Sequence, residues 1–320
     1  MPEGTPCHPG ALLTSSLLLA CFLGPVVGQH HVKMQRGPIY RTEGSHVSMW
    51  CNVSRNTASV EQIFEWSVFM LHKPGVKLQI VSTAGPEFSY MVYKERVLRR
   101  SEIFIERVRG DSVRLHIVQL QANDQGEYEC YTPNMASTYY GTYSASLQLT
   151  VIPDTLKVLM MPTNLDVEAE DLLQLTCEVS TKTHRHTHLS VAWYLQQDAQ
   201  TRSILSLSRD FVVSPGPAYL ERHSASEISM EKMGRASYRL TILSVQLSDW
   251  GQVYCEATEW IQDLDESWYP LTHKQSQKAR VHVTRKAATL LAVVSSSSSA
   301  SSLPSRITGA LFLLLVPFIV

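Results

Sequence analysis

The chain has 320 residues, with 28 basic and 29 acidic side chains and a formal net charge of −1. This balance excludes binding to nucleic acid through bulk electrostatic attraction. The length is typical of two domains rather than one.

Residues 1–28 are predicted to form a secretory signal peptide. An apolar segment at 11–23 is followed by the small residues Val26 and Gly28, a pattern typical of a cleavage site. The early segment departs from the usual pattern because it carries Glu3 and no basic residue. Cleavage would remove two of the six cysteines and leave the other four in an oxidising compartment.

Residues 29–151 are predicted to form the first domain. Apolar and polar side chains alternate around Cys51, around Trp66 and in the run that leads to Cys130, and this period is typical of half-buried strands. The order Cys, Trp, Cys at this spacing is the signature of an immunoglobulin sandwich, in which a disulfide between facing strands packs on the indole. Tyr128 holds the position of a tyrosine corner, whose hydroxyl bonds to upstream backbone.

Residues 152–154 contain a proline and are predicted as a linker, and residues 155–284 are predicted as a second domain of the same type. Its signature residues are Cys177, Trp193 and Cys255. One position departs from the pattern: Val253 stands where the tyrosine corner would be, and Tyr254 comes one residue late. We therefore expect the corner to be absent or rebuilt in this domain.

The repeat predicts an all-β fold of two tandem immunoglobulin-like variable-type β-sandwiches. The triplet Asp-x-Gly at 124–126 returns at 249–251, each time just before the second cysteine. The predicted disulfides are Cys51–Cys130 and Cys177–Cys255. Each closes a loop of roughly 80 residues, which leaves room for the additional C′ and C″ strands of a variable-type domain. In the first domain, residues 77–82 are the expected C′ strand and 102–108 the expected D strand.

The C-terminal part predicts a membrane anchor made of lipid. After a short stalk at 285–297, small polar residues and a spacer lead into twelve apolar residues at 309–320, too few for a helix that needs about 20 to span a bilayer. This order is typical of a glycosylphosphatidylinositol attachment signal, with Ser297 as the candidate attachment residue and 298–320 as the removed propeptide. An inefficient membrane anchor and a secreted chain are the alternatives.

Two further motifs could form functional sites, one for glycosylation and one for zinc. Asn52 begins the glycosylation sequence Asn-Val-Ser, and alternation points its side chain away from the core. His184, His186 and His188 could hold zinc from one face of a hairpin. Because no other ligand type is interleaved with these histidines, a solvated loop is the preferred interpretation, and we expect no metal or other cofactor.

The basic residues of the first domain include a candidate partner for Asp124. Variable-type domains often tie this aspartate to an arginine, and Arg100 or Arg107 is the expected partner. Catalytic signatures such as the G-x-S-x-G elbow, the H-E-x-x-H zinc motif and a phosphate-binding glycine loop are missing from the sequence. We expect a protein that is not an enzyme.

The segment after Cys255 is the candidate interface. Glu259, Trp260 and Ile261, followed by Trp268 and Tyr269, are expected at the end of strand F and in the loop into strand G, where the binding loops of variable domains cluster. Tryptophan and tyrosine are enriched among interface anchors. The alternative is that Trp260 packs on its own sandwich and shapes the loop.

The same residues resemble a family. Glu259-Trp260-Ile261 matches the motif for which the EWI subfamily of immunoglobulin-superfamily membrane proteins is named, and residues 128–133, 140–143 and 257–263 are also similar to that family. The resemblance implies a surface glycoprotein with tandem variable-type domains that associates with tetraspanins and modulates adhesion and receptor behaviour. The family's transmembrane helix, membrane-proximal cysteines and basic tail have no counterpart in these residues, so tetraspanin association does not carry over safely.

Together these features predict a recognition or adhesion protein on the cell surface. It would act through contact with another surface protein or by modulating a membrane partner, with a lipid as its own membrane attachment. A soluble secreted ligand or decoy and a single-pass, tetraspanin-associated protein are the two alternatives.

Overall fold

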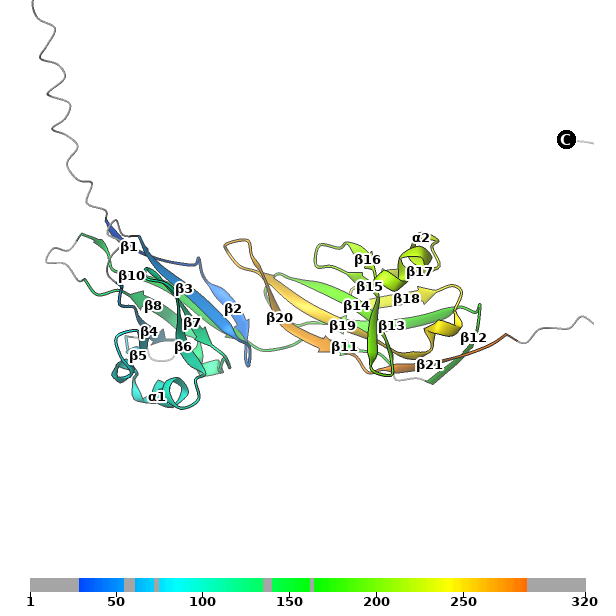
Figure 1. Cartoon of the computed structure of the whole chain (residues 1–320), viewed down its shortest axis with the longest axis horizontal. Coiled ribbons are helices and arrows are strands. Elements are labelled where there is room, and N and C mark those ends of the chain that lie inside the picture. The colour runs from blue at the N-terminus through cyan, green and yellow to red at the C-terminus, as the bar shows by residue number, and fades with distance from the viewer. Residues whose placement is uncertain (1–28, 55–60, 72–74, 135–139, 162–163, 287–320) are drawn as a thin grey trace, which may run out of the picture. The chain divides into compact units, whose positions relative to one another are not determined.

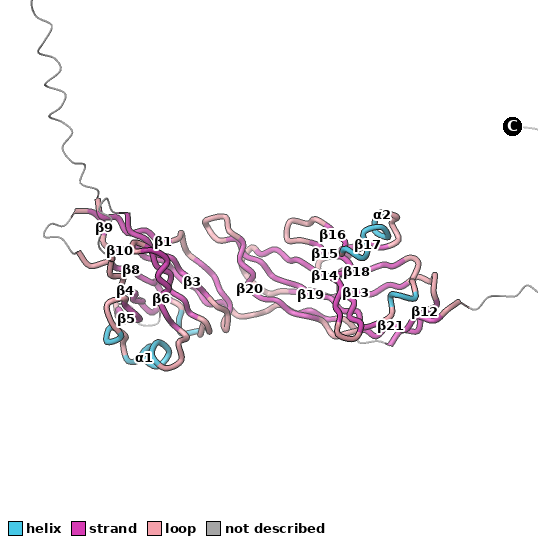
Figure 2. Tube along the Cα trace, viewed as in Figure 1, coloured by secondary structure: helices cyan, strands magenta, loops and turns pink. Residues whose placement is uncertain are grey.

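The computed structural model describes residues 29–54, 61–71, 75–134, 140–161 and 164–286, and in this part of the chain it forms two β-sandwiches (Figure 1). Strands make up almost all of the regular structure, and the helices are short (Figure 2). The all-β architecture of tandem immunoglobulin-like sandwiches predicted from the sequence is confirmed.

The first sandwich packs two sheets with the strand orders β6-β7-β3-β1-β9 and β2-β10-β8-β4-β5. Its strands are β1 (His30–Met34), β2 (Ile39–Thr42), β3 (Val47–Ser54), β4 (Glu65–Met70), β5 (Lys77–Ser82), β6 (Ile103–Arg109), β7 (Ser112–Ile117), β8 (Gly126–Tyr131), β9 (Gly141–Thr142) and β10 (Ser144–Ile152). Its helical turns are η1 (Pro86–Phe88), α1 (Met91–Leu98) and η2 (Ala122–Asp124). The C′ strand coincides with the expected 77–82, and the D strand begins one residue later than expected.

The second sandwich packs a sheet of order β11-β13-β18-β17 on one of order β12-β21-β19-β14-β15-β16, with β20 paired to β19. Its strands are β11 (Lys157–Leu159), β12 (Asn164–Glu168), β13 (Leu173–Ser180), β14 (Thr187–Gln197), β15 (Gln200–Leu207), β16 (Val213–Pro215), β17 (Ile228–Met233), β18 (Ser237–Ile242), β19 (Gly251–Gln262), β20 (Trp268–Gln275) and β21 (Ala279–Thr284). Its helical turns are η3 (Pro217–Tyr219), α2 (Leu220–Ser224) and η4 (Leu247–Asp249).

Each sandwich has its own core, centred on a disulfide and a tryptophan. Alternation along β3 and β13 turns Cys51 and Cys177 inward, where they are bonded to Cys130 and Cys255. Trp66 lies opposite Cys130 in the strand register, as Trp193 lies opposite Cys255, and both indoles are completely buried. Such a disulfide stabilises a small domain by about 4 kcal/mol in the chain-entropy model.

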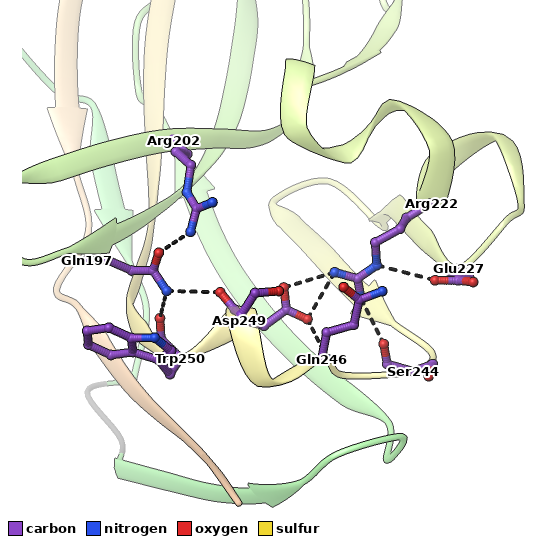
Figure 3. Close-up of polar contacts among 9 residues, drawn as sticks. Gln197, Arg202, Arg222, Glu227, Ser244, Gln246, Asp249 and Trp250 are labelled. Carbon is purple, nitrogen blue, oxygen red and sulfur yellow. Dashed lines mark hydrogen bonds and ion pairs between the residues drawn. The ribbon is translucent and has the colours of Figure 1, made fainter. Parts of the chain in front are cut away.

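The aspartate before strand F is held by an arginine in both sandwiches, but the partner is not the expected one. Arg96 Nη1 lies 2.6 Å from Asp124 Oδ1, and Arg222 Nη1 donates to both carboxylate oxygens of Asp249 at 2.9 and 3.0 Å (Figure 3). The prediction of Arg100 or Arg107 was wrong, since both face acidic residues near the surface instead. The correct arginine lies in a helical turn that strand periodicity does not reveal.

The tyrosine corner exists only in the first sandwich. The hydroxyl of the fully buried Tyr128 donates to the Asp124 carbonyl at 2.8 Å. Burial raises the pKa of this phenol well above its ordinary value, so the bond-donating form is the one present at physiological pH. In the second sandwich Val253 is buried at that position, and Tyr254 stacks on Tyr194 with ring centroids 5.5 Å apart.

Candidate recognition surface

The Glu-Trp-Ile motif lies at the end of strand F, the first of the two places expected for this segment, and not in the loop into strand G. β19 continues through residues 259–261 and pairs with β14 on one side and β20 on the other. The connecting loop is limited to residues 263–267. Alternation along β19 buries Glu259 and Ile261 and leaves Trp260 on the outer face, so the three residues have different roles.

Glu259 is a structural residue. The residue is 1% exposed, and its Oε1 accepts hydrogen bonds from the hydroxyls of Thr181 at 2.9 Å and Thr187 at 2.8 Å. A buried carboxylate is costly unless it is hydrogen-bonded, and these two donors lie on either side of the turn between β13 and β14. Glu259 therefore fixes this turn against β19 and is not available to a partner.

Trp260 is half-buried against its own sandwich. Its Nε1 donates to Ser190 Oγ at 2.8 Å, and the guanidinium of Arg209 lies 5.1 Å from its ring centre. This arrangement matches the alternative in which Trp260 shapes the surface around it. The indole supplies one wall of a surface and cannot be removed without loss of packing.

A second indole and a histidine extend this wall. Arg209 also lies 5.5 Å from the ring centre of Trp268, within the range of a cation–π contact. The ring of His188 lies 4.7 Å from Trp268, and its Nδ1 is 2.9 Å from the Arg209 carbonyl. The guanidinium thus lies within cation–π distance of both indoles.

Phe211 completes the surface, and sequence reasoning missed it. It lies in the turn between β15 and β16, 60% exposed, beside Val212 at 58%. Its ring centre is 5.7 Å from that of His188. The sequence signal was available, because Phe211 begins an apolar run between Asp210 and Ser214 where a turn would be polar.

The backbone of Phe211 is strained. Its φ of 63° lies in the left-handed region, which is a genuine outlier for a bulky side chain. Strain of this kind costs of order 1–3 kcal/mol and concentrates at functional sites. We call the set Phe211, Val212, Trp260, Trp268, Arg209 and His188 the aromatic patch.

Tyr269, the fifth expected interface residue, makes its contacts within the chain. Its hydroxyl donates to the His46 carbonyl at 2.7 Å, and the guanidinium of Arg41 lies 3.7 Å from its ring centre. Arg41 also makes a two-pronged ion pair with Asp263, with N to O distances of 3.0 and 2.6 Å. The β19–β20 hairpin thus contacts the end of β2, and Tyr269 belongs to that contact.

The structure also locates the predicted glycosylation residue and two of the three clustered histidines. Asn52 lies on the outer face of β3, half-buried. His186 and His188 have ring centres 5.1 Å apart, and the described residues contain no group of three or more histidine, cysteine or acidic side chains that could hold a metal. Ser297 lies outside the described residues. Within the residues that are described, no helix is long and apolar enough to cross a membrane.

Comparison with known proteins identifies relatives of both sandwiches. Residues 153–295 match a family model described as an IgSF3-like, immunoglobulin-like domain. Human immunoglobulin superfamily member 2 is 49% identical over 260 residues, which cover 80% of this chain and 25% of that protein. Member 3 of Xenopus tropicalis is 45% identical, over 84% of this chain and 23% of that protein. Mouse member 8 is 38% identical, over 88% and 48% respectively.

The chain spans about a quarter to a half of the length of these curated relatives. The matched segments cover 80 to 88% of this chain. By these matches the chain belongs to the EWI subfamily of the immunoglobulin superfamily, together with members 2, 3 and 8.

Proposed function

We propose that this chain is a cell-surface recognition protein that contacts another surface protein through the aromatic patch of its second sandwich. Aromatic residues and arginine carry most of the binding energy in protein interfaces, and the patch combines Phe211 with two indoles around Arg209. The observation that carries the proposal is Phe211 itself. A phenyl ring held in solvent by a strained turn contributes little to folding, and a contact with a partner would account for it.

The patch is ordered before any partner arrives. Hydrogen bonds fix Trp260 to Ser190 and His188 to the Arg209 carbonyl. Because little side-chain entropy is then lost on binding, such a surface favours affinity. Two residues of the patch have different roles. The hydrogen-bonded Trp260 supports the patch, and Phe211 provides the exposed contact.

Phe211→Gly tests the contact without disturbing the fold, because glycine adopts the left-handed region freely. The matched control is Leu243→Ser, a 54% exposed apolar residue in the turn after β18. The full chain and both variants are applied to an array of cells that each display one surface protein. We expect a partner of the wild-type chain that Leu243→Ser retains and Phe211→Gly loses by about 30-fold, corresponding to a hot-spot residue of about 2 kcal/mol. Equal binding by Phe211→Gly would contradict the proposal.

We also propose that the chain is held on the membrane by a glycosylphosphatidylinositol lipid attached near Ser297. The support is the order of small residues, spacer and apolar segment in 295–320. Treatment of intact cells with a phosphatidylinositol-specific phospholipase tests it. Release of the sandwiches into the medium only after treatment is expected. Retention after treatment would favour a tail embedded in the membrane, and protein already free in the medium would favour the secreted ligand.

A further inference from the structure

A hollow of about 510 Å³ lies on the second sandwich, outside the aromatic patch. It forms where β14, β19 and β21 run side by side, and its lining includes Gln196, Asp198, Trp250, Gln252, Arg280 and His282. Its volume falls within the roughly 300–1,000 Å³ of small-ligand sites.

Trp250 presents an exposed indole from a fixed backbone. The side chain is 45% exposed. The amide of Gln197 donates to the Trp250 carbonyl at 2.6 Å and to the Ser248 carbonyl at 2.9 Å, and Arg202 in turn donates to the Gln197 side chain (Figure 3). On the other side, Asp249 caps the turn and is held by Arg222. The backbone of Trp250 is therefore fixed, and nearly half of its side chain stays exposed.

The first sandwich provides an internal comparison. Its turn has the same capping box, in which Asp124 bonds back to Gln121, and the residue at the position of Trp250 is Gln125. The backbone angles are nearly the same, with φ −63° and ψ 137° at Gln125 and φ −63° and ψ 148° at Trp250. Glutamine thus occupies the same turn with nearly the same backbone, so the turn itself does not require a tryptophan.

The floor of the hollow is polar, and only part of it is already bonded: the Gln196 side chain accepts from Lys278 and donates to the Asp198 carbonyl. Gln252 lies opposite Gln196 on β14 and opposite Arg280 on β21, so the three side chains form one row across the outer face of the sheet. Directly opposed side chains lie about 4.5–5.5 Å apart at Cβ, close enough to bind one ligand together. Within the part of the chain that the structure describes, the side chains of Asp198, Gln252 and Arg280 have no hydrogen-bond or ion-pair partner.

We propose that this hollow binds a neutral saccharide. A pyranose ring has an apolar C–H face, which the indole of Trp250 can cover, and hydroxyls at its rim that both donate and accept. Gln252 matches such hydroxyls with an amide that also does both, Asp198 supplies acceptors and Arg280 supplies donors. The charges of Asp198 and Arg280 offset each other, which favours a neutral ligand over an acidic one.

The test applies the purified full chain to a panel of immobilised neutral and sialylated oligosaccharides. The main variant is Trp250→Gln, which places the residue of the first sandwich in the same turn and so keeps the fold. Gln252→Ala is a second variant on the floor of the hollow. The matched control is Gln125→Ala, at the equivalent turn of the first sandwich.

We expect the wild-type chain to bind at least one neutral oligosaccharide, and Trp250→Gln and Gln252→Ala each to weaken this binding by tenfold or more. The control Gln125→Ala should bind as the wild type does. Binding to no neutral oligosaccharide, binding that Trp250→Gln retains, or binding restricted to sialylated members of the panel would each overturn the proposal. Phe211→Gly should leave saccharide binding unchanged, so the result is independent of the aromatic patch.

Discussion

The strain at Phe211 predicts an inverted order of stability for two substitutions. Phe211→Ala and Phe211→Gly both remove the ring, so the loss of its contacts is the same in each variant. Only alanine keeps a Cβ in the left-handed region, which costs about 1–2 kcal/mol. Glycine loses more chain entropy on folding, by about 0.5–1 kcal/mol. The difference predicts that Phe211→Gly is more stable than Phe211→Ala by about 1 kcal/mol.

Chemical denaturation measures this difference, and Leu243 supplies the control. Leu243 is exposed to a similar extent and is not among the residues with positive φ, so its alanine variant should be the more stable of the pair, the usual order. An alanine variant at Phe211 that is as stable as the glycine variant would refute the claim that the backbone at this residue is strained. The argument that Phe211 is retained for a partner would then lose its main physical support.

Three further predictions concern the contacts that hold the sandwiches. Arg222→Met leaves Asp249 buried without its cation and should destabilise the second sandwich by about 3–5 kcal/mol in denaturation. Burial and the nearby Asp249 raise the pKa of Tyr219 to about 12. The folded chain therefore keeps a proton between about pH 10 and 12 that the unfolded chain releases, and stability should fall with rising pH in that window and less so in Tyr219→Phe. Arg41→Met and Asp263→Asn should show a coupling energy of about 1–3 kcal/mol in a double-mutant cycle, since the pair is 5% and 10% exposed.

The fold could be predicted from the sequence because both copies of the repeat show the alternation of strands and the same cysteine spacing. Alternation around Cys51 and Cys177 fixed which face of each strand is buried, and the structure places both residues accordingly. The length of the strand after Cys255 was harder to predict. Residues 256–262 include the charged Glu256 and Glu259 beside the indole of Trp260, and this composition does not show where the strand ends. Pairing with β14 and β20 keeps the segment extended, so tertiary contacts set the end of the strand.

The arginine ties were predictable in principle but not from strand patterns. Tyr93 and Arg96 stand three positions apart, as do Tyr219 and Arg222, and both pairs lie in or beside a helical turn that precedes strand D. Comparison of the two repeats would have shown the shared spacing. The backbone angle of Phe211, in contrast, depends on the turn between β15 and β16 and could only be found in the structure.

The two sandwiches also indicate how to separate folding from function in this chain. Where both copies keep a residue, as with the aspartate of each capping box, the residue satisfies a buried donor or charge that either fold would leave unpaired. Where one copy departs without a change in backbone, as Trp250 departs from Gln125, folding does not explain the residue. A single exposed apolar residue is common on a protein surface, so the departure at Trp250 gains its meaning from the polar hollow that the indole lines. The same reasoning applies to Phe211, whose strained backbone opposes folding rather than favouring it.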